Sequence, residues 1–178
     1  MAEQALQTTI TNPDLAGAAV ETESTHQQEQ RRIPDPKPAD KHGWWWGTGR
    51  RKTAVARVRL KPAEQGGKGR LLVQITRKKF KTIEEYFSEP RDRKNAYAAL
   101  ELSGLKDDLD VFVRVSGGGF MSQAEAIRLG ISRAVVAHDP THFSALRDAG
   151  FLSRDPRKVE RKKYGQPGAR RRFQFSKR

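Results

Sequence analysis

The sequence predicts a small α/β domain of about four strands and three helices, followed by a long, extended basic tail. Short stretches in which apolar and polar residues alternate occur between residues 53 and 115, which is typical of half-buried strands. Apolar residues at spacings of three and four mark helices among and after them. Beyond Phe151 both patterns stop and basic residues dominate. These observations indicate one compact domain with an extension at each end.

The first two strands are predicted from alternation. The first begins near Thr53 and has Arg57 and Arg59 on its outer face. Its apolar positions are Ala54, Ala56, Val58 and Leu60. A Gly-Gly turn signal lies within residues 64–69, and the second strand follows with Leu71, Val73 and Ile75. We therefore expect the two strands to pair as an antiparallel hairpin.

The middle of the chain adds a short strand at residues 78–81, helix-forming residues at 82–87 and a longer helix at 91–102. Ala96, Tyr97 and Leu100 give the longer helix its apolar stripe, and Gly104 ends it. The fourth strand occupies residues 109–115, where apolar residues again alternate with polar ones.

The clearest helix follows three glycines and spans residues 122–137. Its apolar stripe consists of Ala124, Ile127, Ile131, Ala134 and Val135. Ser122 is its predicted N-cap, with Glu125 completing a capping box. Pro140 ends it, and a short last helix at 141–149 is closed by Gly150.

Charge divides the chain into an acidic start and a basic remainder. The whole chain has 35 Lys+Arg, 21 Asp+Glu and a formal net charge of +14, yet residues 1–47 carry a net charge of −3. We predict a disordered extension at 1–46, a globular RNA-binding domain at 47–150 and an extended tail at 151–178. Trp44, Trp45 and Trp46 are the exception in the extension, since they could dock onto the domain or stack on bases.

The composition excludes several classes of protein. The chain has no cysteine, so it forms no disulfide or thiolate metal site. No apolar run approaches the ~18 residues of a membrane span, and residues 1–10 do not resemble a secretory signal. We therefore expect a soluble, cytoplasmic protein whose strong positive charge needs a polyanionic partner.

The tail is the strongest candidate for RNA binding. Residues 154–178 carry 11 basic and 2 acidic residues, interleaved with Tyr164, Phe173 and Phe175. Cations neutralise phosphates, and aromatic rings stack on unpaired bases, so this mixture favours an irregular RNA surface over a membrane. The candidate RNA-binding residues are Arg50, Arg51, Lys52, Arg57, Arg59, Gly117, Gly118, Gly119, Arg128, Arg154, Arg157, Lys158, Arg161, Lys162, Lys163, Tyr164, Arg170, Arg171, Arg172, Phe173 and Phe175.

Other motifs do not favour catalysis or a metal. The three glycines lack the spacing of a nucleotide-binding loop, so they form either a tight turn or a contact to RNA phosphate. Pro140 separates His138 from His142, and Glu84 and Glu85 point about 100° apart on a helix. We therefore expect no enzyme, no cofactor and no metal site.

Five motifs resemble the bacterial small ribosomal subunit protein nine family. Residues 47–58 read GTGRRKTAVARV, residues 84–87 read EEYF, and residues 117–128 begin with GGG and end with SQA and AIR separated by one residue. Residues 152–165 read LSRDPRKVERKKYG, and the chain closes with QFSKR at 174–178. The motifs occur in the family order and cover about residues 47–178.

The resemblance implies a small mixed sheet with helices on one side and a left-handed βαβ crossover, as in part of another small-subunit ribosomal protein. It implies a place in the head of the small subunit, with ribosomal RNA and neighbouring head proteins as partners. It also implies that the tail reaches transfer RNA at the peptidyl site through Ser176, Lys177 and Arg178.

The chain departs from the family pattern in two places, and two alternative functions are also considered. Residues 1–46 precede the usual family start, and residues 76–81 replace an Asn-Gly turn with TRKKFK, which adds four cations. The alternatives to a ribosomal protein are the protein cofactor of an RNA-processing ribonucleoprotein and a phosphotransferase that uses the glycine loop.

Overall fold

The computed structural model describes residues 33–63 and 68–177. The predictions that concern residues 1–32, the glycine pair at 66–67 and Arg178 lie outside the described residues. Within the described part the elements are β1 (Trp45–Arg51), β2 (Ala54–Pro62), β3 (Leu71–Gln74), β4 (Phe80–Thr82), α2 (Ile83–Tyr86), α3 (Pro90–Ser103), β5 (Leu109–Ser116), α4 (Phe120–His138), the 3₁₀ turn η2 (Pro140–His142) and α5 (Phe143–Asp148). The predicted mixed class is confirmed. However, the described sheet has five strands and not four, and the described helices number four and not three.

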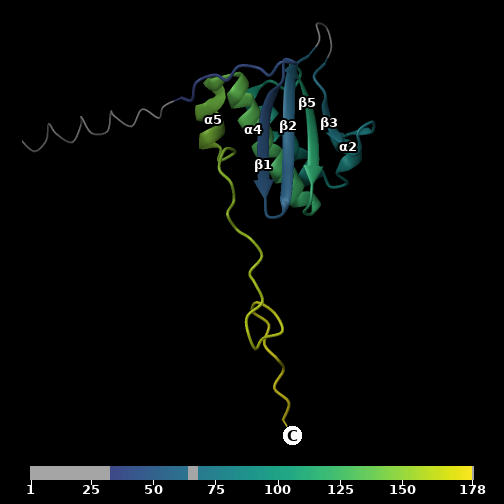
Figure 1. Ribbon diagram of the computed structural model, residues 1–178, viewed down its shortest axis with the longest axis vertical. Coiled ribbons are helices and arrows are strands. Elements are labelled where there is room, and N and C mark those ends of the chain that lie inside the picture. Colours follow the sequence, from purple (N-terminus) through teal and green to yellow (C-terminus); the bar gives the residue numbers. More distant parts are fainter. Residues whose placement is uncertain (1–32, 64–67, 178) are drawn as a thin grey trace, which may run out of the picture. The chain divides into compact units, whose positions relative to one another are not determined.

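The strands are ordered β1-β2-β5-β3-β4 in one mixed sheet (Figure 1). β2 pairs antiparallel with β1 and with β5, whereas β3 pairs parallel with β5 and antiparallel with β4. The predicted β2–β3 hairpin is therefore wrong, because β5 lies between the two strands. A Gly-Gly signal predicts where the chain turns but not which strands pair. In this sheet β5 is the central strand, and its Leu109, Val111 and Val113 are buried. The connection from β3 to β5 contains β4, α2 and α3, and its predicted left hand stays a prediction.

β1 was absent from the sequence prediction. It forms a hairpin with β2 through the two-residue turn at Lys52 and Thr53. Its inward positions are Gly47 and Gly49, which show no apolar alternation because they have no side chain. Both are buried since β1 lies directly against α4, and a Cβ atom on either would overlap a backbone carbonyl of that helix. The strand begins at Trp45, so Trp45 and Trp46 belong to the sheet.

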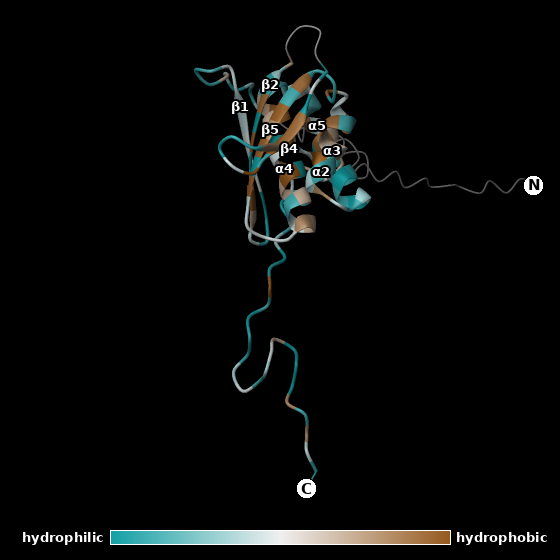
Figure 2. Cartoon of the chain, turned by 90° about the vertical axis from the view of Figure 1, so that its right-hand side faces the viewer, coloured by the Kyte–Doolittle hydropathy of each residue, from teal (hydrophilic) through white to brown (hydrophobic). Residues whose placement is uncertain are grey.

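The core lies between one face of the sheet and the helices, and Figure 2 shows brown, hydrophobic positions along the strands and helices that meet there. α4 contributes most of its length, and Ala124, Ile127, Ile131, Ala134 and Val135 are all buried as the spacing predicts. The predicted capping box is wrong, because the helix begins two residues earlier and has Gly119 as its N-cap. Glu125 pairs with Arg51 instead. None of the helices in the described part combines the length and the apolar character needed to cross a membrane.

Candidate RNA interface

The β1–β2 turn and the glycine loop meet at one end of the sheet. A Cβ atom on Gly117 would lie 2.7 Å from the Thr53 carbonyl oxygen, and one on Gly118 would lie 2.7 Å from the Ala54 Cβ. Both glycines have φ of +70°, which L side chains rarely adopt. The tight-turn interpretation of the loop is thus supported by the geometry, and the loop brings its backbone close to the turn. We call this region, residues 50–53 and 117–119, the loop end.

Lys52 stands out at the loop end because its backbone is strained. Its φ is +49°, and no other non-glycine residue in the described ranges has a positive φ. The left-handed conformation costs an L residue roughly 1–2 kcal/mol, and hairpin turns usually place Gly or Asn there. The side chain is exposed. A strained, exposed cation at a turn is a feature that points to function more than to stability.

Arg51 joins the loop end to the start of the tail. Its guanidinium pairs with Glu125 of α4, and Nη2 donates to Asp155 Oδ2 at 3.1 Å. The side chain is only 12% exposed. Arg51 is therefore occupied by protein contacts, although the sequence placed it among the RNA-binding residues.

Asp155, at the start of the tail, also pairs with a second arginine, Arg157. It accepts bonds from Arg157 Nη2 at 2.8 Å and from the Arg157 backbone N–H at 2.9 Å. Arg157 first, and Arg51 next, hold the pKa of the Asp155 carboxyl well below its ordinary value of about 3.9. Because the pKa of Asp155 is lowered in the folded protein, its ion pairs with Arg51 and Arg157 are fully formed above the ordinary pKa of Asp. They are lost as the pH falls through the lowered pKa.

Arg128 is likewise built into the domain. Its Nη1 donates to Asn95 Oδ1 at 2.6 Å, and its guanidinium lies 4.7 Å from the centre of the Phe151 ring. Burial, and then the nearby Arg51, lower the pKa of Arg128 from its ordinary value. The guanidinium thus fastens α4 to α3 and to the residues after α5. Arg50, by contrast, is exposed at the end of β1.

The tail has no helix or strand in its described part, as Figure 1 shows for the segment after α5. Tyr164 is fully exposed, and Phe173 and Phe175 are 70% and 87% exposed. The predicted cations of the tail are also exposed, namely Arg154, Arg157, Lys158, Arg161, Lys162, Lys163, Arg170, Arg171 and Arg172. Exposed rings among exposed cations are typical of surfaces that bind single-stranded nucleic acid.

The tail folds back on itself once. Glu160 pairs with Lys163 at 3.2 Å and with Arg170 at 2.9 Å, so residues 160–170 form a loop. Arg170, and then Lys163, lower the pKa of Glu160. The loop separates a first cationic segment, 154–163, from a second, 170–177. The predicted tip residues Ser176 and Lys177 are exposed at the end of the second segment.

Sequence reasoning missed how the segment before β1 is held. Trp45 lies against His138 with 4.4 Å between ring centres, and its Nε1 donates to the Lys37 carbonyl oxygen at 3.0 Å. Lys37 in turn donates its backbone N–H to Ala137 at 3.1 Å. The docking interpretation therefore holds for Trp45, and Trp44 lies 5.5 Å from Phe112, edge to face. Trp46 is 53% exposed and does not share this docking.

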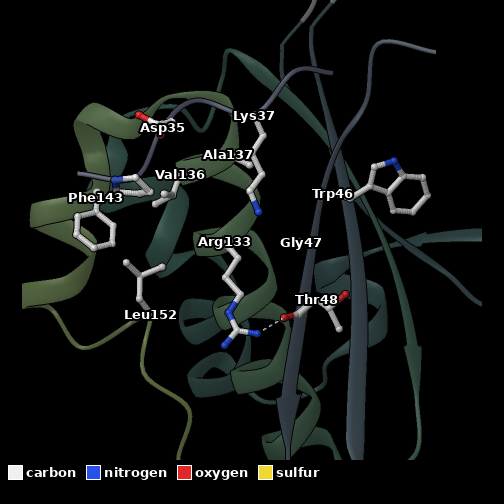
Figure 3. A pocket seen from close by; sticks show the side chains of 11 residues that line it. Asp35, Lys37, Trp46, Gly47, Thr48, Arg133, Val136, Ala137, Phe143 and Leu152 are labelled. Carbon is white, nitrogen blue, oxygen red and sulfur yellow. Dashed lines mark hydrogen bonds between the residues drawn. The ribbon is translucent and has the colours of Figure 1, made fainter. Parts of the chain in front are cut away.

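A groove of about 390 Å³ lies beneath this docked segment (Figure 3). Lys37 and Arg133 are among the residues that line it, and Phe143 and Leu152 form its apolar side. Arg133 Nη1 donates to the Thr48 carbonyl oxygen at 2.7 Å, which covers the open edge of β1. The described residues include no group of three or more acidic, histidine or cysteine side chains placed to share a metal ion.

Comparison with known proteins places this chain among ribosomal sequences. A family model described as ribosomal protein S9/S16 matches residues 49–178. Small ribosomal subunit protein uS9 of Solidesulfovibrio magneticus is 51% identical over 135 residues, which cover 76% of this chain and 97% of the relative. The protein of that name from Sorangium cellulosum is 50% identical over 133 residues, 75% of this chain and 95% of the relative. That from Thermotoga maritima is 46% identical over 134 residues, 75% of this chain and 96% of the relative.

Proposed function

The chain belongs to the ribosomal protein S9/S16 family, and from this premise we propose that it is a structural constituent of the small ribosomal subunit that binds ribosomal RNA through its tail and its loop end. The family is one of structural proteins and not of enzymes. Ribosomal RNA and other ribosomal proteins are accordingly its partners. The observation that carries the proposal is the tail, where exposed cations and exposed rings alternate without helix or strand.

The tail suits RNA because its cations and rings remain exposed and are not packed into a core. Residues 154–178 carry a net charge of +9, and only Asp155 and Glu160 offset it. A chain this charged gains most by releasing counterions from phosphates. The extended backbone lets rings such as Phe173 and Phe175 reach unpaired bases. The ion pairs of Arg51 with Glu125 and Asp155 hold the start of the tail beside the loop end. The first cations of the tail therefore lie near the loop end.

The loop end supplies a second contact with the same RNA. Arg50, Lys52 and the glycine loop offer exposed cations and closely approaching backbone beside the start of the tail. The glycines allow a phosphate to approach the backbone, and α4 begins directly after them. Arg51 and Arg128 support this surface from within rather than bind RNA themselves.

Changing Lys52 to Gly should separate the effect of its strained backbone on stability from the effect of its charge on RNA binding. We expect the free energy of unfolding to rise by about 0.5–1 kcal/mol, because glycine removes the left-handed strain at a smaller cost in chain entropy. The affinity for small-subunit ribosomal RNA should fall, with the salt slope lower by about 0.7–0.9 for one lost phosphate contact. Denaturant unfolding and salt titration measure the two effects. Lys52→Arg keeps charge and strain and should behave as wild type; an unchanged salt slope in the glycine variant would remove Lys52 from the interface.

The end of the tail is proposed to contact transfer RNA at the peptidyl site. Changing Lys177 and Arg178 to Gln should weaken transfer RNA binding to small subunits and reduce its salt slope by about 1.4–1.8. Incorporation of the protein into subunits should not change, because the remaining cations are upstream. A matched variant with Arg170 and Arg171 changed to Gln should instead weaken ribosomal RNA binding. Equal transfer RNA affinity in the tip variant and the wild type, across the salt range, would contradict the proposal.

A further inference from the structure

The face of the sheet that is turned away from the helices carries a cluster of rings and guanidinium groups. Exposure alternates along β1, where Gly47 and Gly49 are buried against α4 and Trp46 is exposed on the other side. In Figure 3 the Trp46 indole points away from α4, on the far side of β1. The strand register pairs Trp46 with Arg59, and Arg59 with Phe112. Three neighbouring strands thus bring these side chains together on one open surface.

Arg59 lies within a cluster of aromatic rings that meet edge to face. Its guanidinium carbon is 4.9 Å from the centre of the Trp44 ring and 5.4 Å from that of Phe112. Phe112 also contacts Phe80, edge to face, at 5.8 Å between ring centres. These contacts hold the inner part of the cluster in place. Trp46 lies at its margin with 53% of its surface exposed, although an indole gains from burial.

The charges on this face repel one another. Arg57 on β2 is directly opposite Arg114 on β5, and like charges in that position destabilise a sheet. No ion pair or hydrogen bond found in residues 33–63 and 68–177 satisfies the guanidinium of Arg57, Arg59 or Arg114. An anion between the two strands would relieve this repulsion.

A hollow of about 220 Å³ lies among these groups, with Trp46 and Phe112 beside the three arginines. It is smaller than the roughly 300–1,000 Å³ of pockets that enclose whole small ligands. The hollow therefore suits one flat group of a longer molecule. A flat ring against indole and guanidinium, with negative charge beside it, is the chemistry of a nucleotide.

We propose that this open face is a further RNA-binding surface, which holds an unpaired nucleotide with its base against Trp46 and its phosphate between Arg57 and Arg114. The inference rests on the proposed ribosomal RNA binding and adds a site separate from the tail and the loop end. The nucleotide is unpaired because bases within a duplex expose no ring face. An acidic protein would satisfy the arginines without needing the exposed indole.

The test measures binding of two probes to the full-length chain, a labelled 12-nucleotide single strand of mixed sequence and its duplex with the complement. Trp46→Ala should lower affinity for the single strand by about 5- to 150-fold and leave duplex affinity within about twofold. Trp46→Phe keeps a ring and should retain most of the single-strand affinity. Equal single-strand affinity in wild type and Trp46→Ala would overturn the inference and leave the tail-based function standing, whereas no binding of either probe by the wild type would overturn both.

A charge-matched pair tests the arginines. The double variant Arg57→Gln and Arg114→Gln should weaken single-strand binding at least several-fold more than Arg91→Gln with Lys94→Gln, which removes two exposed cations from α3. Equal losses in the two variants would show a general charge effect and would overturn the phosphate site. A 12-residue glutamate peptide serves as the acidic-protein probe. If it quenched tryptophan fluorescence as strongly as the single strand does, the face would be assigned to a protein partner and the inference would be overturned.

Discussion

Changing six tail cations to Gln, namely Arg161, Lys162, Lys163, Arg170, Arg171 and Arg172, is expected to lower the affinity for small-subunit ribosomal RNA by at least about 10³-fold at ~50 mM salt. All six are exposed, and only Lys163 and Arg170 have an acidic partner among the described residues, namely Glu160. Each lost phosphate contact removes about 0.7–0.9 from the slope of log affinity against log salt. The slope should therefore fall by about 4–5, as measured by filter binding across a salt series.

The matched control changes the four arginines of that set to Lys and keeps the charge. Its salt slope should equal that of the wild type, because the slope counts neutralised phosphates. Its affinity should fall only modestly, by the loss of bidentate and stacking contacts that guanidinium groups make. A Gln variant whose salt slope equals that of the wild type would show that the tail does not meet phosphates.

Gly49→Thr is expected to prevent folding of the domain or to cost more than about 4 kcal/mol of unfolding free energy. That is a large part of the roughly 5–15 kcal/mol that stabilises a typical domain. A side chain at Gly49 would collide with the Ala126 carbonyl oxygen and the Gly130 backbone nitrogen of α4. Those atoms belong to a helix backbone and cannot turn aside as a side chain would. Thermal unfolding followed by circular dichroism measures the loss.

The matched control places the same residue at Gly119. A Cβ atom there meets nothing within 4 Å, its φ of −96° is open to any residue, and threonine is about as good an N-cap as glycine. We expect Gly119→Thr to change the unfolding free energy by no more than about 0.5 kcal/mol. If Gly49→Thr were as stable as this control, the close packing of β1 on α4 would be disproved.

The elements with a local signature were predicted correctly. β2 and β5 alternate, and α3 and α4 repeat at three and four residues, so their positions follow from side chains that are close in sequence. β1 could not be predicted in this way, because its inward residues are Gly47 and Gly49. Glycine is required at both positions because α4 packs too closely for a side chain. The partner of β3 was wrong for a related reason. Its pairing with β5 depends on a residue separation of about forty, about which local turn signals carry no information.

The candidate site divides in the same way. The charge and rings of the tail are properties of composition, so their exposure was foreseeable. The internal roles of Arg51 and Arg128 were not, since they depend on Glu125, Asp155 and Asn95, which only the fold brings close. The cluster around Arg59 was equally hidden, because Trp44 and Phe112 meet it only through the register of three strands.

The most direct test of the tail's role is ultraviolet crosslinking of small subunits assembled with the full-length chain, followed by mass spectrometry of the crosslinked peptides. We expect ribosomal RNA crosslinks to concentrate in residues 157–175, with a second group at the loop end. Crosslinks confined to α3 and α5, with none in the tail, would contradict RNA binding by the tail.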